Sequence, residues 1–315
     1  MAEALKGEAL SGAASKAQRV RIRASALGRG DALLDSPSPS SYHRAMLFPY
    51  PGSKFGLMPK YLRLFPPHKH FVDVFGGSGA AILGKPRSRL ETLNDIDPAI
   101  INLFTIVRDG RLDELKHLCR YTPNKSRRMF EEARAIVKSN DADPVRSAWA
   151  FLYIAYVCNG SRNPCAASPA DFGFVRAPHS CATIWEGITR TLETVCNRLK
   201  RVQLTNWPCE RCIDLLDTPD TLFFLDPSYY PPTLQSLHKL YEHVLTIADH
   251  KKMLARLQKI EGKVFLCGYS HPDYERALRG WHSHEFEVTT NMGRKGTASL
   301  RIEKCWMNYD PEARR

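Results

Sequence analysis

Three short motifs carry side chains that could do chemistry, and they stand far apart in the sequence. The first, FVDVFGGSGA (71–80), is an apolar run that ends in closely spaced glycines. The second is LNDID (93–97), in which Asp95 follows another apolar run. The third is DPSY (226–229), which follows the apolar segment TLFFL. Each motif joins the pattern of a buried strand to polar or flexible residues at its carboxyl end.

The glycine turn and Asp95 together suit a ligand related to nucleotides. A strand, a tight glycine turn and a helix N-terminus allow the backbone to approach a ligand closely. An acid at the end of the next strand can accept hydrogen bonds from ribose hydroxyls. Each feature alone has an ordinary explanation, because glycines serve tight turns and Asp95 could cap a helix beginning at Pro98. The combination favours binding over structure alone.

DPSY offers a slot for a flat base that carries an exocyclic amino group. The hydrogen-bond acceptors would be the Asp226 carboxylate and the Pro227 carbonyl, and the stacking face would be Tyr229. Hydrogen bonds from the amine to these acceptors would pull its nitrogen toward tetrahedral geometry and free the lone pair for direct attack. No covalent intermediate is then needed, so none of the nine cysteines is required as a nucleophile.

Alternating strand and helix patterns from residue 46 onward position these motifs. Strand patterns occupy 71–75, 90–97, 221–225, 263–269, 285–290 and 301–309. Helical spacing occupies 99–107, most of 111–200, and 245–260, where Thr246 and Asp249 offer a capping box and Gly262 a stop. The alternation predicts an α/β doubly wound sheet, and the helical middle is expected to be an insertion.

Composition limits the class of protein. With 315 residues and 43% hydrophobic content, the chain can bury a real core without disulfides or metals. A net charge of +12 favours a polyanionic partner, nucleic acid first. No apolar run approaches the ~20 residues of a membrane helix. Irregular cysteine spacing, with the lone C-x-x-C pair Cys209 and Cys212, indicates reduced cytoplasmic thiols and no metal site.

We predict three parts of the chain. Residues 1–45 are rich in Ala, Ser, Gly and Arg, and they are expected to form a disordered basic tail. Met46 is a candidate for the true start. Residues 46–110 and 201–315 would form the catalytic domain, and 111–200 would form an inserted target-recognition region.

In this order, the motifs resemble those of the Dam-type DNA adenine-N6 methyltransferases, especially the phage and prophage members. YPGSK (50–54) matches the aromatic-x-G-G-K opening of that family, and FGGSG (75–79) matches its F-x-G-x-G. NDID (94–97) matches the acidic strand end, and DPSY matches D-P-P-Y. The closing segments GKVFLCGY and RIEKCWMNY match its last strands, which often end in W-[LM]-N-Y. The resemblance covers about residues 46–309.

The resemblance implies a Rossmann-like, doubly wound sheet that binds S-adenosylmethionine (SAM) and carries an inserted, mostly helical DNA-recognition region. By matched position it implies cofactor contacts from Tyr50, Lys54, Phe75, Gly76, Gly77, Gly79, Asp95 and Asp226. It implies catalytic roles for Asp226, Pro227 and Tyr229. A similar polar segment of the family's insertion approaches DNA, which here would be Asn159, Ser161, Arg162 and Asn163.

The sequence therefore predicts an adenine-specific enzyme that transfers the methyl group of SAM to N6 of a flipped adenine in duplex DNA. Three alternatives stay open: cytosine N4 methylation by the same fold, methylation of RNA or a protein amide, and a catalytically weakened DNA-binding relic. We expect a monomeric, cytoplasmic protein, encoded by a bacterium or phage, in a restriction–modification or prophage setting, with no metal and no membrane partner.

Two departures from the family pattern bear on activity. Ser228 replaces the second proline of D-P-P-Y, which removes one φ restraint from the turn and predicts a slower enzyme. Pro208 and Cys209 stand about where the family often has an Asp followed by an aromatic that contacts the adenine of SAM. Glu210 is the candidate substitute for that acid.

Overall fold

The computed structural model describes residues 46–139, 143–158, 164, 172, 185–233, 243–290 and 299–313. The chain divides into a unit of residues 1–36 and a unit of residues 37–315, and every described residue belongs to the second. The expected tail at 1–45 and the expected DNA-binding residues Asn159, Ser161, Arg162 and Asn163 lie outside the described residues.

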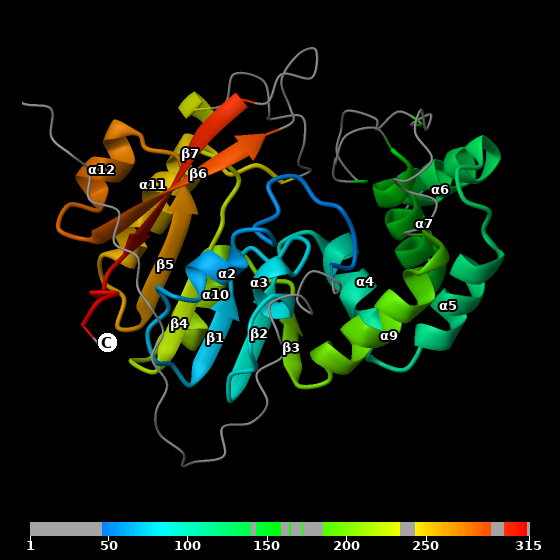
Figure 1. The fold of residues 1–315 in the computed structure, drawn as a ribbon, viewed down its shortest axis with the longest axis horizontal. Coiled ribbons are helices and arrows are strands. Elements are labelled where there is room, and N and C mark those ends of the chain that lie inside the picture. Colours follow the sequence, from blue (N-terminus) through cyan, green and yellow to red (C-terminus); the bar gives the residue numbers. More distant parts are fainter. Residues whose placement is uncertain are drawn as a thin grey trace, which may run out of the picture. The chain divides into compact units, whose positions relative to one another are not determined.

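A seven-stranded mixed sheet, in the order β3-β2-β1-β4-β5-β7-β6, forms the centre of the second unit as far as it is described (Figure 1). Its strands are β1 (His70–Asp73), β2 (Leu90–Asn94), β3 (Val202–Thr205), β4 (Thr221–Leu225), β5 (Lys263–Gly268), β6 (His282–Thr290) and β7 (Ser299–Met307). The first five strands in this order run parallel, whereas β7 pairs antiparallel with both β5 and β6. The predicted alternation of strands and helices produces this parallel core.

Helices fill the connections between the strands. They are α2 (Met58–Tyr61), α3 (Ala80–Leu83), α4 (Pro98–Arg108), α5 (Leu112–Tyr121), α6 (Arg127–Ser139), α7 (Pro144–Val157), α9 (Ile188–Leu199), α10 (Cys209–Leu216), α11 (Ile247–Leu257) and α12 (Pro272–Ala277), with a 3-10 turn at Pro231–Thr233. None of the helices in the described part of the chain has the length and apolarity needed to cross a membrane.

Local signals set several helix ends. The side chain of Asp97 accepts a hydrogen bond from the Ala99 amide at the start of α4, where Pro98 is the first helical residue. The capping box predicted for Thr246 and Asp249 is present at the start of α11. The expected stop at Gly262 is wrong, because α11 ends at Leu257.

Successive side chains of each strand point alternately into two apolar layers, one on each face of the sheet. Because both faces are buried, the strand sequences are continuous hydrophobic runs. Phe71, Phe224 and Phe265 pack on one face with residues of α2, α3 and α4. Val72, Phe223 and other residues pack on the opposite face with α10, α11 and α12. Helices therefore cover both faces, as a doubly wound sheet requires (Figure 1).

The helices of the middle region pack on α4 and share its apolar layer. Residues of α5, α6, α7 and α9 belong to the same buried cluster as α3 and α4. Two buried tryptophans bind the residue that follows α5. The ring N–H group of Trp149 donates to the Thr122 hydroxyl at 2.9 Å, and that of Trp185 donates to the Thr122 carbonyl at 3.0 Å. Region 111–200, where it is described, thus continues the core instead of forming a separate one.

Candidate active site

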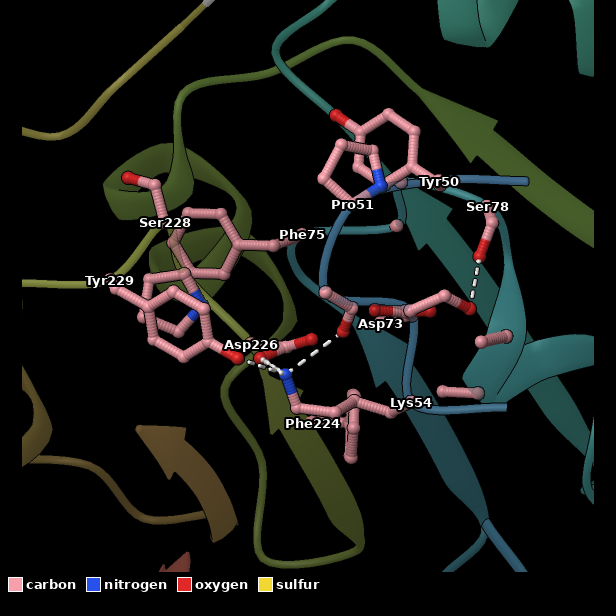
Figure 2. A pocket seen from close by; sticks show the side chains of 17 residues that line it. Tyr50, Pro51, Lys54, Asp73, Phe75, Ser78, Phe224, Asp226, Ser228 and Tyr229 are labelled. Atoms are coloured by element: carbon pink, nitrogen blue, oxygen red, sulfur yellow. Dashed lines mark hydrogen bonds and ion pairs between the residues drawn. The ribbon is translucent and has the colours of Figure 1, made fainter. Parts of the chain in front are cut away.

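The motifs meet at the carboxyl ends of three adjacent strands, β2, β1 and β4. One cleft at this edge is lined by the segment 50–54, the glycine turn and the DPSY turn (Figure 2). An adjoining cleft adds Asp95, Ile96 and His243 and shares Tyr50 and Phe75 with the first. Parallel strands place their carboxyl ends at one edge, so segments far apart in sequence converge there.

Lys54 is the centre of a buried polar cluster beside the first cleft. Its ammonium lies 2.7 Å from Asp226 Oδ1 and donates to the Gly52 carbonyl at 3.1 Å and to the Tyr229 hydroxyl at 3.4 Å. Glu303 Oε1 lies 3.4 Å from the same nitrogen. Figure 2 shows the ammonium directed at Asp226 and Tyr229. Lys54, expected from the family pattern to contact the cofactor, is here engaged with the candidate catalytic acid.

The pKa values of this cluster follow from burial and from the shared cation. Burial raises the pKa of the Asp226 carboxyl, and the Lys54 ammonium opposes that rise. Burial also raises the pKa of Glu303, and the Lys54 ammonium again opposes the rise. Burial alone would lower the pKa of Lys54, but Asp226, Tyr229 and Glu303 together raise it well above its ordinary value. The lysine therefore stays charged, and it is the group that favours an ionised Asp226.

Tyr229 presents its ring beside Asp226 (Figure 2). Its ring stacks on Tyr269, which follows β5, with centroids 4.3 Å apart and planes 17° apart. Its hydroxyl donates to Glu303 Oε2 at 3.3 Å. The guanidinium of Arg301 lies 5.8 Å from the centre of the Tyr269 ring. The aromatic wall of the slot is thus a pair of stacked tyrosines.

Ser228 has a partner that a proline could not have. Its hydroxyl accepts a hydrogen bond from the Leu245 amide at 3.0 Å, which ties the turn to the segment that precedes α11. A hydrogen bond of this kind restrains the turn by another route than a proline ring. The substitution therefore does not leave the turn unsupported.

The glycines of the turn serve two different purposes. Gly77 has a φ of +48°, and a Cβ there would lie 3.0 Å from Cε1 of Tyr50, so the cleft needs glycine at this position. Gly79 has a φ of +70°, and its added Cβ would lie 3.0 Å from Cζ of Phe104. Gly76 and Gly77 line the cleft, whereas Gly79 allows α3 to approach α4 and is not among the lining residues.

Asp95 braces the glycine turn from the end of β2. One of its carboxylate oxygens accepts the Gly77 amide at 2.7 Å, and the other accepts the Asp97 amide at 2.8 Å. Each oxygen keeps a second lone pair, which a ribose hydroxyl could use. Burial raises the pKa of Asp95 to about 6. The helix cap is Asp97, which leaves Asp95 available for the cleft.

Two acids of the site were missed by the motif analysis. Asp73, at the end of β1, lines the first cleft, and its Oδ1 has no hydrogen-bond partner among the described residues. Burial raises its pKa well above the ordinary value. Glu303 lies in β7, where it contacts Lys54 and Tyr229. In both cases the available signal was an acid inside an apolar strand pattern, FVDVF and RIEKCWM.

The proposed substitute acid lies elsewhere. Glu210 accepts a hydrogen bond from the Cys209 thiol at 3.3 Å and does not line either of the two clefts. Asn206 instead supports this edge, since its amide donates to the carbonyls of Asp95 at 2.7 Å and Ile96 at 2.9 Å. The free Cys209 and Cys212 are both buried on α10, and burial raises the pKa of each thiol.

The sheet order, the glycine turn and the acid-lined clefts are consistent with the fold of the Rossmann-like methyltransferases. Residues 50–174 match the family model of the D12 class N6 adenine-specific DNA methyltransferases. This match supports the Dam-type adenine methyltransferase family, whose members are enzymes that act on DNA adenine. Family, fold class and adenine specificity are confirmed predictions, and methyltransferases of this family generally use SAM. No match is found among curated proteins.

Proposed function

We propose that this chain methylates adenine N6 in duplex DNA with SAM bound in the two adjoining clefts and with Asp226, Pro227 and Tyr229 holding the flipped base. The observation that carries the proposal is the position of Asp226. Its Oδ1 is fixed by Lys54 at 2.7 Å, its side chain is 18% exposed, and it lines both clefts. A carboxylate at that junction can serve a base on one side and a cofactor on the other.

Several features of the clefts fit SAM. The buried Asp73 has an oxygen without a hydrogen-bond partner in the described structure, which suits the cationic methionine portion. Gly77 leaves space beside Tyr50 that a Cβ would fill, and Asp95 can accept from the ribose. Ile96, 42% exposed at the adjoining cleft, offers an apolar surface to the adenine ring. When bound, SAM supplies an electrophilic methyl group on a positively charged sulfur.

The chain's own residues prepare the amine for attack. Adenine N6 is a poor nucleophile because its lone pair is conjugated with the ring. Asp226 and the Pro227 carbonyl would accept its two N–H groups and favour tetrahedral nitrogen. As the new N–C bond forms, the nitrogen must lose one proton, and a carboxylate whose pKa is raised by burial is a suitable acceptor. Most of the remaining acceleration would come from positioning.

Duplex DNA requires the base to leave the stack. Extrusion costs a few kcal/mol, and stacking on an aromatic ring recovers about 1–3 kcal/mol per base. Tyr229 is the proposed stacking surface, and its ring already stacks on Tyr269. The predicted DNA contacts at Asn159, Ser161, Arg162 and Asn163 stay part of the proposal, as does a recognition role for 111–200. So do the cytoplasmic location, the monomeric state, the absence of a bound metal and the prophage or restriction–modification setting.

The proposal is tested by label transfer. Wild-type protein is incubated with methyl-tritiated SAM and unmethylated duplex DNA, and the product nucleosides are separated. Asp226→Ala and the nearly isosteric Asp226→Asn run beside it. We expect label in N6-methyladenine for the wild type and a loss of at least about 10²-fold for both variants, because a preorganised electrostatic contact is removed.

Other outcomes would change the reading in defined ways. Label in N4-methylcytosine would keep the fold and the slot but reject adenine as the substrate. Absence of label, while SAM and DNA both bind, would favour the weakened relic. Transfer to single-stranded DNA or RNA in preference to duplex DNA would reject base flipping.

A further inference from the structure

Glu303 takes part in none of the steps proposed above, yet it is buried against the residues that do. Side chains alternate along β7, so Glu303 shares a row with Cys305 and Met307, and all three are buried. A carboxylate in such a row is costly unless it has partners. Its two side-chain partners among the described residues, Lys54 and Tyr229, belong to the candidate active site.

The two oxygens of Glu303 divide their contacts. Oε1 lies 3.4 Å from the Lys54 ammonium, and Oε2 accepts the Tyr229 hydroxyl at 3.3 Å. An ammonium has three N–H groups. Lys54 donates to the Gly52 carbonyl and to the Tyr229 hydroxyl, and the carboxylates of Asp226 and Glu303 are its ion-pair partners. Glu303 thus completes the surroundings of the cation and fixes the direction of the Tyr229 hydroxyl.

The charge balance gives this contact a consequence for Asp226. One ammonium serves two carboxylates, and it lies nearer to Asp226 than to Glu303. A second anion beside the ammonium competes with Asp226 for that cation. It also draws part of the cation's field away from Asp226, whose carboxylate then remains a strong acceptor for the substrate amine.

A metal ion is the rival explanation for this cluster. Ligand atoms of Asp226, Cys267 and Glu303 lie within 4.8 Å of one another. An ion held by them would compete with the Lys54 ammonium, which is 5% exposed and already paired with both carboxylates. The raised pKa of Lys54 keeps that ammonium charged. The lysine therefore supplies the positive charge that a metal would otherwise bring.

We propose that Glu303 is a positioning residue for methyl transfer, which orients Asp226 and Tyr229 through Lys54 and touches neither base nor cofactor. The inference rests on the proposed function. Other titratable groups also face this cluster. They are Tyr61 of α2, Asp73 of β1, Cys267 of β5, Tyr269 just after β5, and Cys305 of β7. They are the same in wild type and variants, so a pH shift caused by changing Glu303 reports on Glu303.

The test is Glu303→Gln in the full chain. Single-turnover methyl transfer to duplex DNA is measured across pH, and SAM affinity is measured separately by calorimetry. We expect the rate constant at pH 8 to fall by about 10- to 100-fold, the cost of a small misplacement of reacting groups. SAM affinity should change less than about threefold. Loss of a neighbouring negative charge lowers the pKa of Asp226, so the acid limb of the profile should move to lower pH.

Two further variants separate positioning from stability. Glu91→Gln removes another buried glutamate paired with cations, in β2 and away from the clefts, and should leave the pH profile unchanged. Glu303→Asp keeps the charge but shortens the reach. It should give an intermediate rate with the acid limb of the wild type, and it provides the measurement if Glu303→Gln does not fold.

The results separate the two proposals. If the wild type methylates adenine while Glu303→Gln, or Glu303→Asp in its place, keeps the wild-type rate and pH profile, the inference is wrong and the proposed function stands. A loss of rate in Glu303→Gln that matches its loss of folded protein, without a shift of the acid limb, would also overturn it. A wild type that transfers no methyl group would reject the proposed function first, and the role of Glu303 with it.

Discussion

Two buried ion-pair clusters lie on the same face of the sheet, and they are built in opposite ways. At the carboxyl edge, the ammonium of Lys54 serves two carboxylates, Asp226 and Glu303. In the other cluster, Lys85 and Arg198 both serve one carboxylate, Glu91. Phe71 of β1 pairs in register with Glu91 of β2 and with Leu222 of β4. Residues that pair in register lie on the same face of a sheet, so these three side chains share one face. One cluster has an excess of acceptors, and the other has an excess of donors.

The carboxylate of Glu91 accepts four hydrogen bonds from within the fold. Glu91 Oε1 accepts from Lys85 at 2.7 Å, from Arg198 at 2.8 Å and from the Ser88 amide at 3.0 Å, and Oε2 accepts from Arg198 at 2.6 Å. Burial alone would raise the pKa of Glu91, but Arg198 and Lys85 lower it. Its charge is balanced from within the fold by two cations.

The Asp226 cluster differs because its carboxylates are not matched one to one with cations. The pKa values of Asp226 and Glu303 are raised, whereas that of Glu91 is lowered. The comparison teaches that burial of an ion pair does not by itself mark a functional site. What distinguishes the site is an acceptor left over beside a cleft.

The largest expected effect comes from removing Lys54, the cation that Asp226 and Glu303 share. Lys54→Met should lower the single-turnover rate constant by about 10²-fold or more, because it removes a preorganised electrostatic contact to Asp226. The pKa of Asp226 should rise further, so the acid limb should move to higher pH, opposite to the shift expected for Glu303→Gln. Rate constants measured against pH check both statements.

Lys85→Met is the matched control for that experiment. It removes a buried lysine whose pKa burial lowers to about 8, and Arg198 still pairs with Glu91. The rate constant per folded molecule should stay within about twofold of the wild type. Equal losses in Lys54→Met and Lys85→Met, with no movement of the acid limb, would erase the distinction between the clusters.

A smaller effect on function, and a larger one on folding, is expected for Glu91→Gln. Two buried cations lose their anion, and breaking a buried pair in this way costs about 3–5 kcal/mol of stability. The free energy of unfolding in urea measures this loss. Because the folded pKa of Glu91 is lowered, its stabilisation is present at neutral pH and disappears as the pH falls through that lowered value. A stability equal to that of the wild type would show that Glu91 is not the anchor of its cluster.

The smallest effect is expected for Ser228→Ala. The variant loses the hydrogen bond from the Leu245 amide, which is worth about 1 kcal/mol net. The methyl-transfer rate should fall by no more than about threefold, because Asp226 keeps its contact with Lys54. Paired measurements of the unfolding midpoint and the single-turnover rate check this. A loss of more than tenfold would give Ser228 a direct part in the reaction.

Much of the fold followed from patterns that are local in the sequence. Apolar runs that end in glycine or acid predicted β1, β2 and β4, and the capping box at Thr246 and Asp249 predicted the start of α11. These elements are determined by residues close together in the chain. The end of α11 was misplaced because Gly262 serves tertiary packing: a Cβ there would lie 2.9 Å from Cε2 of Phe223. Local pattern reading has no access to that contact.

The candidate site divides in the same way. Asp95 and the DPSY turn could be selected from the sequence, because each follows a strand pattern and carries groups suited to a known chemistry. Asp73 and Glu303 were not selected, because the sequence does not tell whether a single acid within an apolar strand is exposed or buried; both are buried. The family resemblance placed Lys54 near the cofactor but did not indicate its partner.

The sequence by itself determined the set of strands, the glycine turn and the identity of the reactive groups, since these depend on residue types and short spacings. Only the tertiary structure decided which groups share a charge. Lys54 and Tyr229 stand 175 positions apart and meet because the segment before α2 and the turn after β4 line the same cleft. Glu303 joins them because β7 turns back against β5. Electrostatic coupling depends on distance in space, and the chain order does not contain that distance.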